Sequence, residues 1–103
     1  MKILENVVEK MDDTLDEIEF YAERAFLLRT DHKALADTFI KVASVHLDIY
    51  KMLHDRVVEI IEEEKRKGTP PPEMLAIWNY QHGRLVKRLT EARFLVDDFS
   101  KSY

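Results

Sequence analysis

His46 is the residue whose type and position offer most to chemistry, because at helical spacing it lies in the middle of an apolar face, bracketed by Val42, Ala43, Ile49 and Tyr50. A buried imidazole needs hydrogen-bond partners for its ring nitrogens. We expect His46 to be a core histidine that bonds to Thr14, to a tyrosine or to a carboxylate from a neighbouring helix. A metal ligand and a partly exposed interface residue are the two alternative roles.

Two further histidines lie on or beside apolar stripes. His82 is expected near Arg56 and Asn6, and His54 lies at the edge of an apolar face. The polar residues expected in the buried core are His46, Thr14 and His82. The three histidines are spread along a long rod, so they are not expected to meet at one ion within a chain. If a metal did bind, two copies of one histidine at a dimer axis would be the least unfavourable arrangement. The sequence therefore predicts no cofactor and no metal site.

No other pattern in the chain predicts catalysis. The sequence has no cysteine, which excludes disulfides, thiolate metal sites and a cysteine nucleophile. Its only serines are Ser44, Ser100 and Ser102, none of which is flanked by glycines, and no glycine-rich phosphate loop is present. We therefore expect a protein that is not an enzyme.

Charged residues form two clusters of opposite sign. The acidic cluster comprises Asp12, Asp13, Asp16 and Glu17, and the basic cluster comprises Arg84, Lys87, Arg88 and Arg93. A basic cluster can bind nucleic acid, but this one is small and the chain carries a formal net charge of −4. We expect the two clusters to face each other across a seam between helices, and we expect no nucleic-acid partner.

Long apolar segments are missing from the sequence. Glu5 follows the start too soon to leave room for the apolar core of a signal peptide, and no run approaches the roughly 18 apolar residues of a membrane span. The sequence therefore predicts a cytoplasmic protein with no membrane partner.

The spacing of apolar residues predicts three long helices that must position these side chains. Apolar residues recur three and four apart, the period of a helical face packed against a partner, in residues 3–29, 31–67 and 72–100. The second stretch carries two such stripes side by side, which leaves only one narrow polar face. At about 1.5 Å per residue, its roughly 37 residues would span about 55 Å.

Polar and helix-breaking residues mark the two turns. Residues 29–33 interrupt the apolar pattern, and Thr30 or Asp31 is expected to cap the second helix, with one continuous helix as the alternative. Gly68 and the prolines at 70–72 are expected to end the second helix and open the third. Gly83 predicts a bend in the third helix, with the close approach of another backbone as the alternative.

Short turns make sequential helices antiparallel neighbours. Residues 1–103 are therefore expected to form one all-α domain, an elongated three-helix up-down-up bundle with coiled-coil packing. The apolar face of the second helix is wider than a thin monomer can cover, so we expect self-association into a homodimer or homotetramer. The candidate interaction surface comprises Phe20, Leu27, Ile40, Leu47, His54, Ile61, Tyr80 and Phe94.

Residues 15–60 resemble a ferritin-like or rubrerythrin-like helical hairpin. The similarity rests on residues 17–22 of the first helix and on the spacing of six residues in the second, Leu35, Phe39, Ala43, His46, Tyr50 and Leu53. The family implies a four-helix bundle with a di-iron site built from Glu-x-x-His motifs. Here the residue three before His46 is Ala43, so the resemblance implies a bundle that lacks the metal-ligand glutamates.

Packing is the property that the sequence specifies most strongly. We expect a small, non-catalytic module for protein–protein interaction or assembly that works through its helical surfaces. A ferritin-like metal-binding protein, with a degenerate site or a histidine site shared between subunits, is the alternative.

Overall fold

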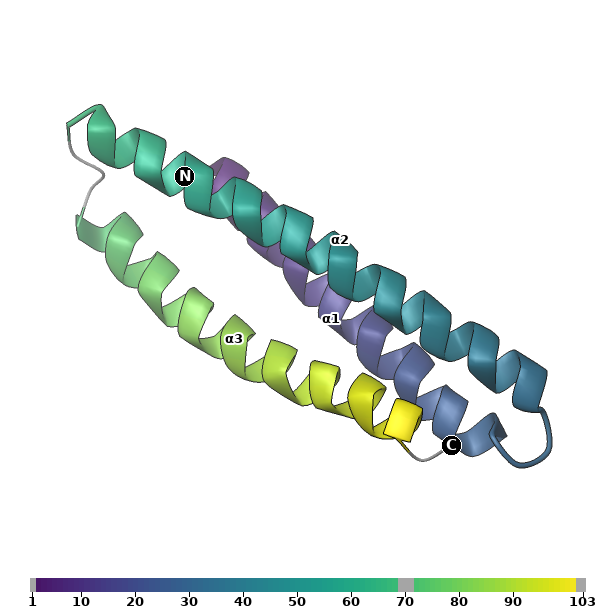
Figure 1. Cartoon of the computed structure of the whole chain (residues 1–103). Coiled ribbons are helices and arrows are strands. Elements are labelled where there is room, and N and C mark those ends of the chain that lie inside the picture. Colours follow the sequence, from purple (N-terminus) through teal and green to yellow (C-terminus); the bar gives the residue numbers. More distant parts are fainter. Residues whose placement is uncertain (1, 69–71, 102–103) are drawn as a thin grey trace.

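Three long α-helices make up the protein in the computed structural model, which describes residues 2–68 and 72–101 (Figure 1). They are α1 (Lys2–Leu28), α2 (Lys33–Arg66) and α3 (Pro72–Lys101), and the described ranges contain no strand. The helices alternate in direction and form a rod of 57 × 19 × 17 Å. The predicted all-α, elongated up-down-up bundle is confirmed, with helix ends within two residues of those expected.

A tight turn separates α1 from α2, so the alternative of one continuous helix is wrong. The His32 amide donates to the Leu28 carbonyl at 2.8 Å, and the Ala36 amide donates to the His32 carbonyl at 2.9 Å. The N-cap residue is His32, and its side chain makes no capping hydrogen bond. The predicted cap by Thr30 or Asp31 is therefore wrong, because backbone groups close this turn instead.

The C-terminal end of α2 follows the predicted pattern. Lys65 and Arg66 lie in its last turn, where cations favour the negative end of the helix dipole. Gly68 has a φ of 124°, a conformation that side-chain-bearing residues rarely adopt. Pro72 is the first residue of α3. The rest of the predicted proline connector, residues 69–71, lies outside the described residues.

All three helices contribute to the core, and α1 packs against both of the others (Figure 1). Its buried face consists of Leu4, Met11, Leu15, Ile18, Ala22 and Ala25. α1 contacts α2 most extensively and α3 less, and α2 and α3 contact each other least. The arrangement leaves open seams along both sides of α3, and these seams hold the sites described below.

Gly83 lies inside α3 without interrupting it. Apart from its chain neighbours and the adjacent backbone of its own helix, nothing lies within 4 Å of the position that a Cβ would take at this residue. The alternative in which another backbone closely approaches Gly83 is therefore wrong.

None of the helices in residues 2–68 and 72–101 combines the length and the apolar character that crossing a bilayer requires.

Candidate binding cleft

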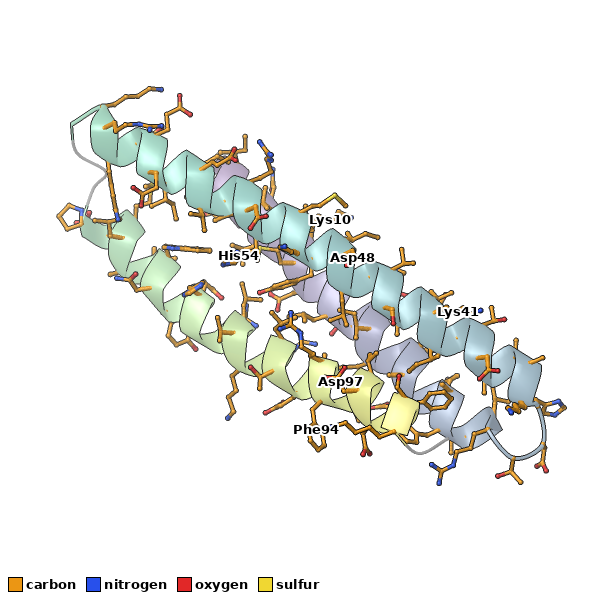
Figure 2. The ribbon with its side chains drawn as sticks, viewed as in Figure 1. Lys10, Lys41, Asp48, His54, Phe94 and Asp97 are labelled. Atoms are coloured by element: carbon orange, nitrogen blue, oxygen red, sulfur yellow. The ribbon has the colours of Figure 1, made fainter. Side chains whose placement is uncertain are left out.

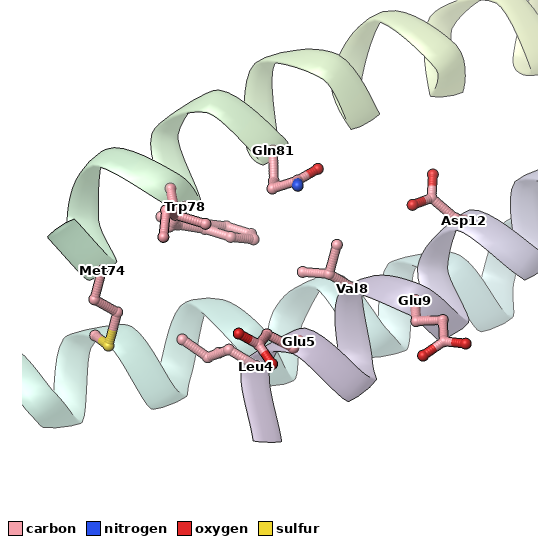
Figure 3. A pocket seen from close by; sticks show the side chains of 9 residues that line it. Leu4, Glu5, Val8, Glu9, Asp12, Met74, Trp78 and Gln81 are labelled. Atoms are coloured by element: carbon pink, nitrogen blue, oxygen red, sulfur yellow. The ribbon is translucent and has the colours of Figure 1, made fainter. Parts of the chain in front are cut away.

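The N-terminal halves of α1 and α3 enclose a cleft of about 270 Å³ (Figure 3). Its apolar lining consists of Leu4, Val8, Met74, Ile77 and Trp78. Figure 3 shows Trp78 extending from α3 toward Val8 of α1. Ile77 is 59% exposed, so it forms an outer lip, whereas Leu4 and Met74 are buried. The cleft therefore has an apolar floor that solvent can reach.

Carboxylates line the α1 side of this cleft. Glu5 and Glu9 are both exposed, and Asp12 closes the far end opposite Gln81 (Figure 3). No ion pair within the described part of the chain involves Glu5 or Glu9. Two carboxylates that have no ion-pair partner among the described residues, beside an apolar floor, create a potential that attracts cations.

Asp12 belongs to a cluster of ion pairs that joins α1 to α3 beyond the cleft. Arg84 Nη1 donates to Asp12 Oδ1 at 2.7 Å and Arg84 Nη2 donates to Asp12 Oδ2 at 2.8 Å. Arg88 donates to Asp12 at 3.0 Å, to Asp16 at 2.8 Å and to Glu19 at 3.2 Å. The predicted seam between acidic and basic clusters is confirmed for these residues, although Asp13 pairs with Lys10 of its own helix at 3.9 Å.

The ion pairs shift the pKa values of their members. The hydrogen bond from Arg84 holds the pKa of Asp12 below its ordinary value, against the opposing effect of burial. The same hydrogen bond raises the pKa of Arg84. Both shifts favour the charged form of the group concerned.

Tyr50 lies just inside this cluster and is 2% exposed. Burial raises the pKa of its hydroxyl, and the negative charge of Asp12 adds to that effect. Among the described residues, none forms a hydrogen bond with the buried Tyr50 hydroxyl. Sequence reasoning placed Tyr50 in an apolar stripe and did not show that its hydroxyl would lack a protein partner.

A second hollow lies farther along the same seam, past the ion pairs. Its lining includes Glu19 and Glu23 of α1, and Phe94 and Leu95 of α3. Phe94 is 68% exposed. The α1–α3 side of the rod thus presents two hollows that are both lined by acidic and apolar residues, with the ion pairs between them.

The predicted interaction surface divides into exposed and buried residues. Phe20, Leu27, Tyr80 and Phe94 are exposed, and the most exposed of them is Leu27 at 79%. Ile40 and Leu47 are partly buried and pack against the core, and His54 is half-buried. Ile61 is 3% exposed and belongs to the core, so its assignment to the surface is wrong. Its stripe on α2 is covered by the protein's own helices rather than left open.

The predicted polar core is buried less completely than expected. Thr14 is buried, but its hydroxyl donates to the Lys10 carbonyl at 2.7 Å and not to His46. His46 is half-buried, lies 2.9 Å from the Val42 carbonyl through Nδ1, and stacks on the Tyr21 ring at 5.9 Å. The expected bond to Thr14 is wrong because both polar groups bond to the carbonyl four residues earlier in their own helix.

His82 is also half-buried. It meets His54 of α2, two residues before Arg56, with the two Nε2 atoms 3.3 Å apart. Its ring also lies 5.2 Å from that of Trp78. The sequence analysis did not predict this pair, which forms because α2 and α3 place the two residues at the same level.

Comparisons with protein-family models, with curated proteins and with solved structures find no match to this chain. The ferritin-like resemblance therefore rests on the sequence alone. The described residues contain no group of three or more His, Asp or Glu side chains placed to share a metal ion. With Ala43 where that family has a glutamate, they do not fit a di-iron ligand set.

Proposed function

We propose that the chain is a non-catalytic helical module for protein–protein interaction or assembly, and that the cleft between α1 and α3 holds an apolar side chain of its partner. The observation that carries this proposal is the combination of an apolar floor with a carboxylate rim in one cleft. Apolar pockets that receive a large side chain at their centre are where interfaces gain most of their binding energy.

The size of the cleft favours a side chain over a metabolite. Its volume of about 270 Å³ lies just below the range of about 300 to 1,000 Å³ that is typical of small-molecule sites. One or two large apolar side chains fill such a space. An α-helix that lies in a hydrophobic groove presents side chains of this kind at a spacing of three and four.

The charges beside the cleft define the partner further. Glu5 and Glu9 form no ion pair within the described residues, so lysine or arginine on the partner would complete their interactions. Complementary charges of this kind speed association and fix orientation more than they add to affinity. The proposed partner segment is an amphipathic helix with an apolar anchor flanked by cations.

Self-association is the second part of the proposal and rests on other residues. Tyr80 and Phe94 project from α3 with exposures of 70% and 68%, and Leu27 projects from α1. Contiguous apolar patches on a surface commonly mark contacts between proteins, and these side chains are proposed to contribute to such a contact. A homodimer or homotetramer would cover these side chains while the acidic cleft stays available for the partner.

Trp78 provides a direct test because it is the chain's one tryptophan and it lines the cleft. The probe is a designed helical peptide with a leucine face flanked by lysines, and its matched control carries glutamates in place of the lysines. We expect the lysine peptide to shift the emission of Trp78 to shorter wavelength in a saturable manner. The glutamate peptide should give no saturable change.

Two variants locate the binding. Ile77→Glu places a charge on the lip of the cleft and should abolish the response to the lysine peptide. Phe94→Glu, made at an exposed apolar position in the second hollow, is the matched control and should keep the response. Equal binding of both peptides, or equal loss of binding in both variants, would refute the assignment to this cleft.

A further inference from the structure

The paired histidines between α2 and α3 form the second site of interest. His54 lies on α2 (Figure 2) and His82 on α3, and their Nε2 atoms are 3.3 Å apart. Two nitrogen ligands at about 2.0 to 2.1 Å from a zinc ion, at the tetrahedral angle of about 109°, lie about 3.3 to 3.4 Å from each other. The two imidazoles are therefore already separated by the distance that tetrahedral coordination requires.

The surroundings of His54 match those of metal-binding histidines. Asp55 Oδ1 lies 3.7 Å from His54 Nδ1, the ring nitrogen that faces away from His82. A carboxylate beside the second nitrogen favours a proton there, which leaves Nε2 with a free lone pair for a metal. At 3.7 Å the carboxylate lies beyond hydrogen-bond distance, and a closer approach would give the carboxylate–histidine arrangement that commonly supports zinc ligands in proteins.

Aromatic rings hold both imidazoles in place. The Tyr50 ring stacks on the His54 ring at 6.4 Å, and the Trp78 ring lies 5.2 Å from the His82 ring. Packing of this kind limits rotation of the two imidazoles. Both Nε2 atoms therefore keep their relative position without a metal, so less side-chain conformational entropy is lost when an ion binds.

Solvent has access to the pair. A hollow of about 340 Å³ between α2 and α3 is lined by His54, His82 and Asp55, together with Tyr50, Lys51, Val86, Leu89 and Arg93. His54 is 28% exposed at its side chain. The hollow has room for an ion and for several water molecules. Water would complete the coordination, since the described chain supplies no third His, Asp or Glu ligand.

The geometry points to a binding site for a borderline transition-metal ion of the Zn²⁺ class, held by Nε2 of His54 and Nε2 of His82, with Asp55 as the supporting carboxylate. In the free pair, one Nε2–H can donate to the other Nε2. To bind a metal through both Nε2 atoms, each neutral ring must carry its proton on Nδ1. The ring that donated through Nε2–H therefore changes tautomer: it loses that proton to solvent and takes one up at Nδ1, so no net proton is released. Imidazole pairs favour Zn²⁺, Ni²⁺ and Cu²⁺, whereas Mg²⁺ prefers oxygen ligands.

Metal binding would connect the two helices that contact each other least. An ion that binds only the folded chain raises its stability by mass action. Zn²⁺ should therefore raise the midpoint of thermal unfolding of the purified protein, and Mg²⁺ at the same concentration should not. Trp78 lines the cleft between α1 and α3 and also contacts His82, but neither metal ligand lines that cleft, so either assignment can fail without the other.

The test is a calorimetric titration of metal-free protein with ZnCl₂, read together with the thermal midpoint. Wild-type protein should bind one ion per chain. His54→Asn and His82→Asn should each lose both the binding and the thermal shift, and Asp55→Asn should bind about 10-fold more weakly. His46→Asn is the matched control, because His46 lies against Tyr21 and away from the pair, and it should bind as wild type does.

A measurement on the unaltered chain separates a lost site from a misfolded variant. In ¹H–¹⁵N spectra of the imidazole rings, Zn²⁺ should shift the Nε2 signals of His54 and His82 and leave those of His32 and His46 in place. Failure of the wild-type protein to bind Zn²⁺, or Zn²⁺-induced shifts confined to His32 or His46, would overturn the assignment.

Discussion

Arg84 on α3 binds both carboxylate oxygens of Asp12 on α1, at 2.7 and 2.8 Å. The two residues lie 72 positions apart in the chain, and both side chains are about two-thirds shielded from solvent. Bidentate pairs between arginine and a carboxylate are stronger and more directional than single contacts. This interaction fixes how α3 is placed along α1 and closes the inner end of the cleft.

We predict that the Asp12 pair makes stability sensitive to acid. The pKa of Asp12 is lowered in the folded protein, so its contribution is complete above the unfolded-state value of about 3.9 and is lost as the pH falls through the lower folded value. Asp12→Asn should reduce the free energy of unfolding at neutral pH by about 1 to 2 kcal/mol. Urea unfolding between neutral pH and about pH 3 measures both effects.

Asp13→Asn is the matched control for this prediction. Asp13 is exposed and pairs only with Lys10 of the same helix, at 3.9 Å. An exposed pair of this kind contributes about 0.5 kcal/mol or less. Equal losses in the two variants would show that the general charge of α1, and not the Asp12–Arg84 contact, controls stability.

We predict opposite effects from adding a methyl group at the two glycines. Gly83 lies inside α3 with nothing within 4 Å of a Cβ, so Gly83→Ala should raise the free energy of unfolding by about 0.5 to 1 kcal/mol. Gly68 has equally open surroundings, but its φ of 124° is strained for a residue with a side chain. Gly68→Ala should therefore lower the free energy of unfolding by about 1 kcal/mol. Thermal unfolding followed by circular dichroism measures both, and a loss of stability in Gly83→Ala would contradict the open surroundings found at this position.

Tyr50→Phe should leave the protein as stable as the wild type or up to about 1 kcal/mol more stable. The substitution removes a buried hydroxyl that bonds to no described residue, and it keeps the ring that fills the core. Tyr50→Ala is the comparison, and its cavity should cost about 3 kcal/mol or more. A loss above about 1 kcal/mol in Tyr50→Phe would mean that the hydroxyl has a stabilising partner.

Self-association should be visible by light scattering at tens of micromolar protein, with a mass at least twice the 12.2 kDa of one chain. The combined variant Tyr80→Glu and Phe94→Glu places charges where two exposed aromatic residues stand, and it should reduce this mass. Thr38→Glu, at an exposed position on α2, is the control and should not. A wild-type mass of 12.2 kDa at these concentrations would refute self-association.

The helices were predictable from local periodicity, and the seam of ion pairs was predictable from the short turns that make α1 and α3 parallel. Apolar spacing gave the bounds of α1, α2 and α3 within two residues, and the parallel placement of α1 and α3 brought Asp12 level with Arg84. The turn before α2 was located correctly, but its cap was not, because backbone hydrogen bonds around His32 replaced the side-chain cap.

Other features depend on how whole helices sit against each other. His54 and His82 are 28 residues apart on different helices, and no local pattern shows that their rings meet. The cleft arises where α1 and α3 stand apart, although the mixture of Glu5 and Glu9 with Leu4 and Val8 was visible in the sequence. Ile61 depends on helix packing in the same way. Its place on a second apolar stripe indicated an exposed residue, but the neighbouring helices bury it.

The dimensions of the rod determine how the protein diffuses. A body of 57 × 19 × 17 Å meets more friction than a sphere of equal mass, and it turns end over end more slowly than it spins about its long axis. A single chain should therefore elute early from a size-exclusion column. Amide groups whose N–H bonds lie along the helix axes should relax in NMR experiments as if they belonged to a larger protein.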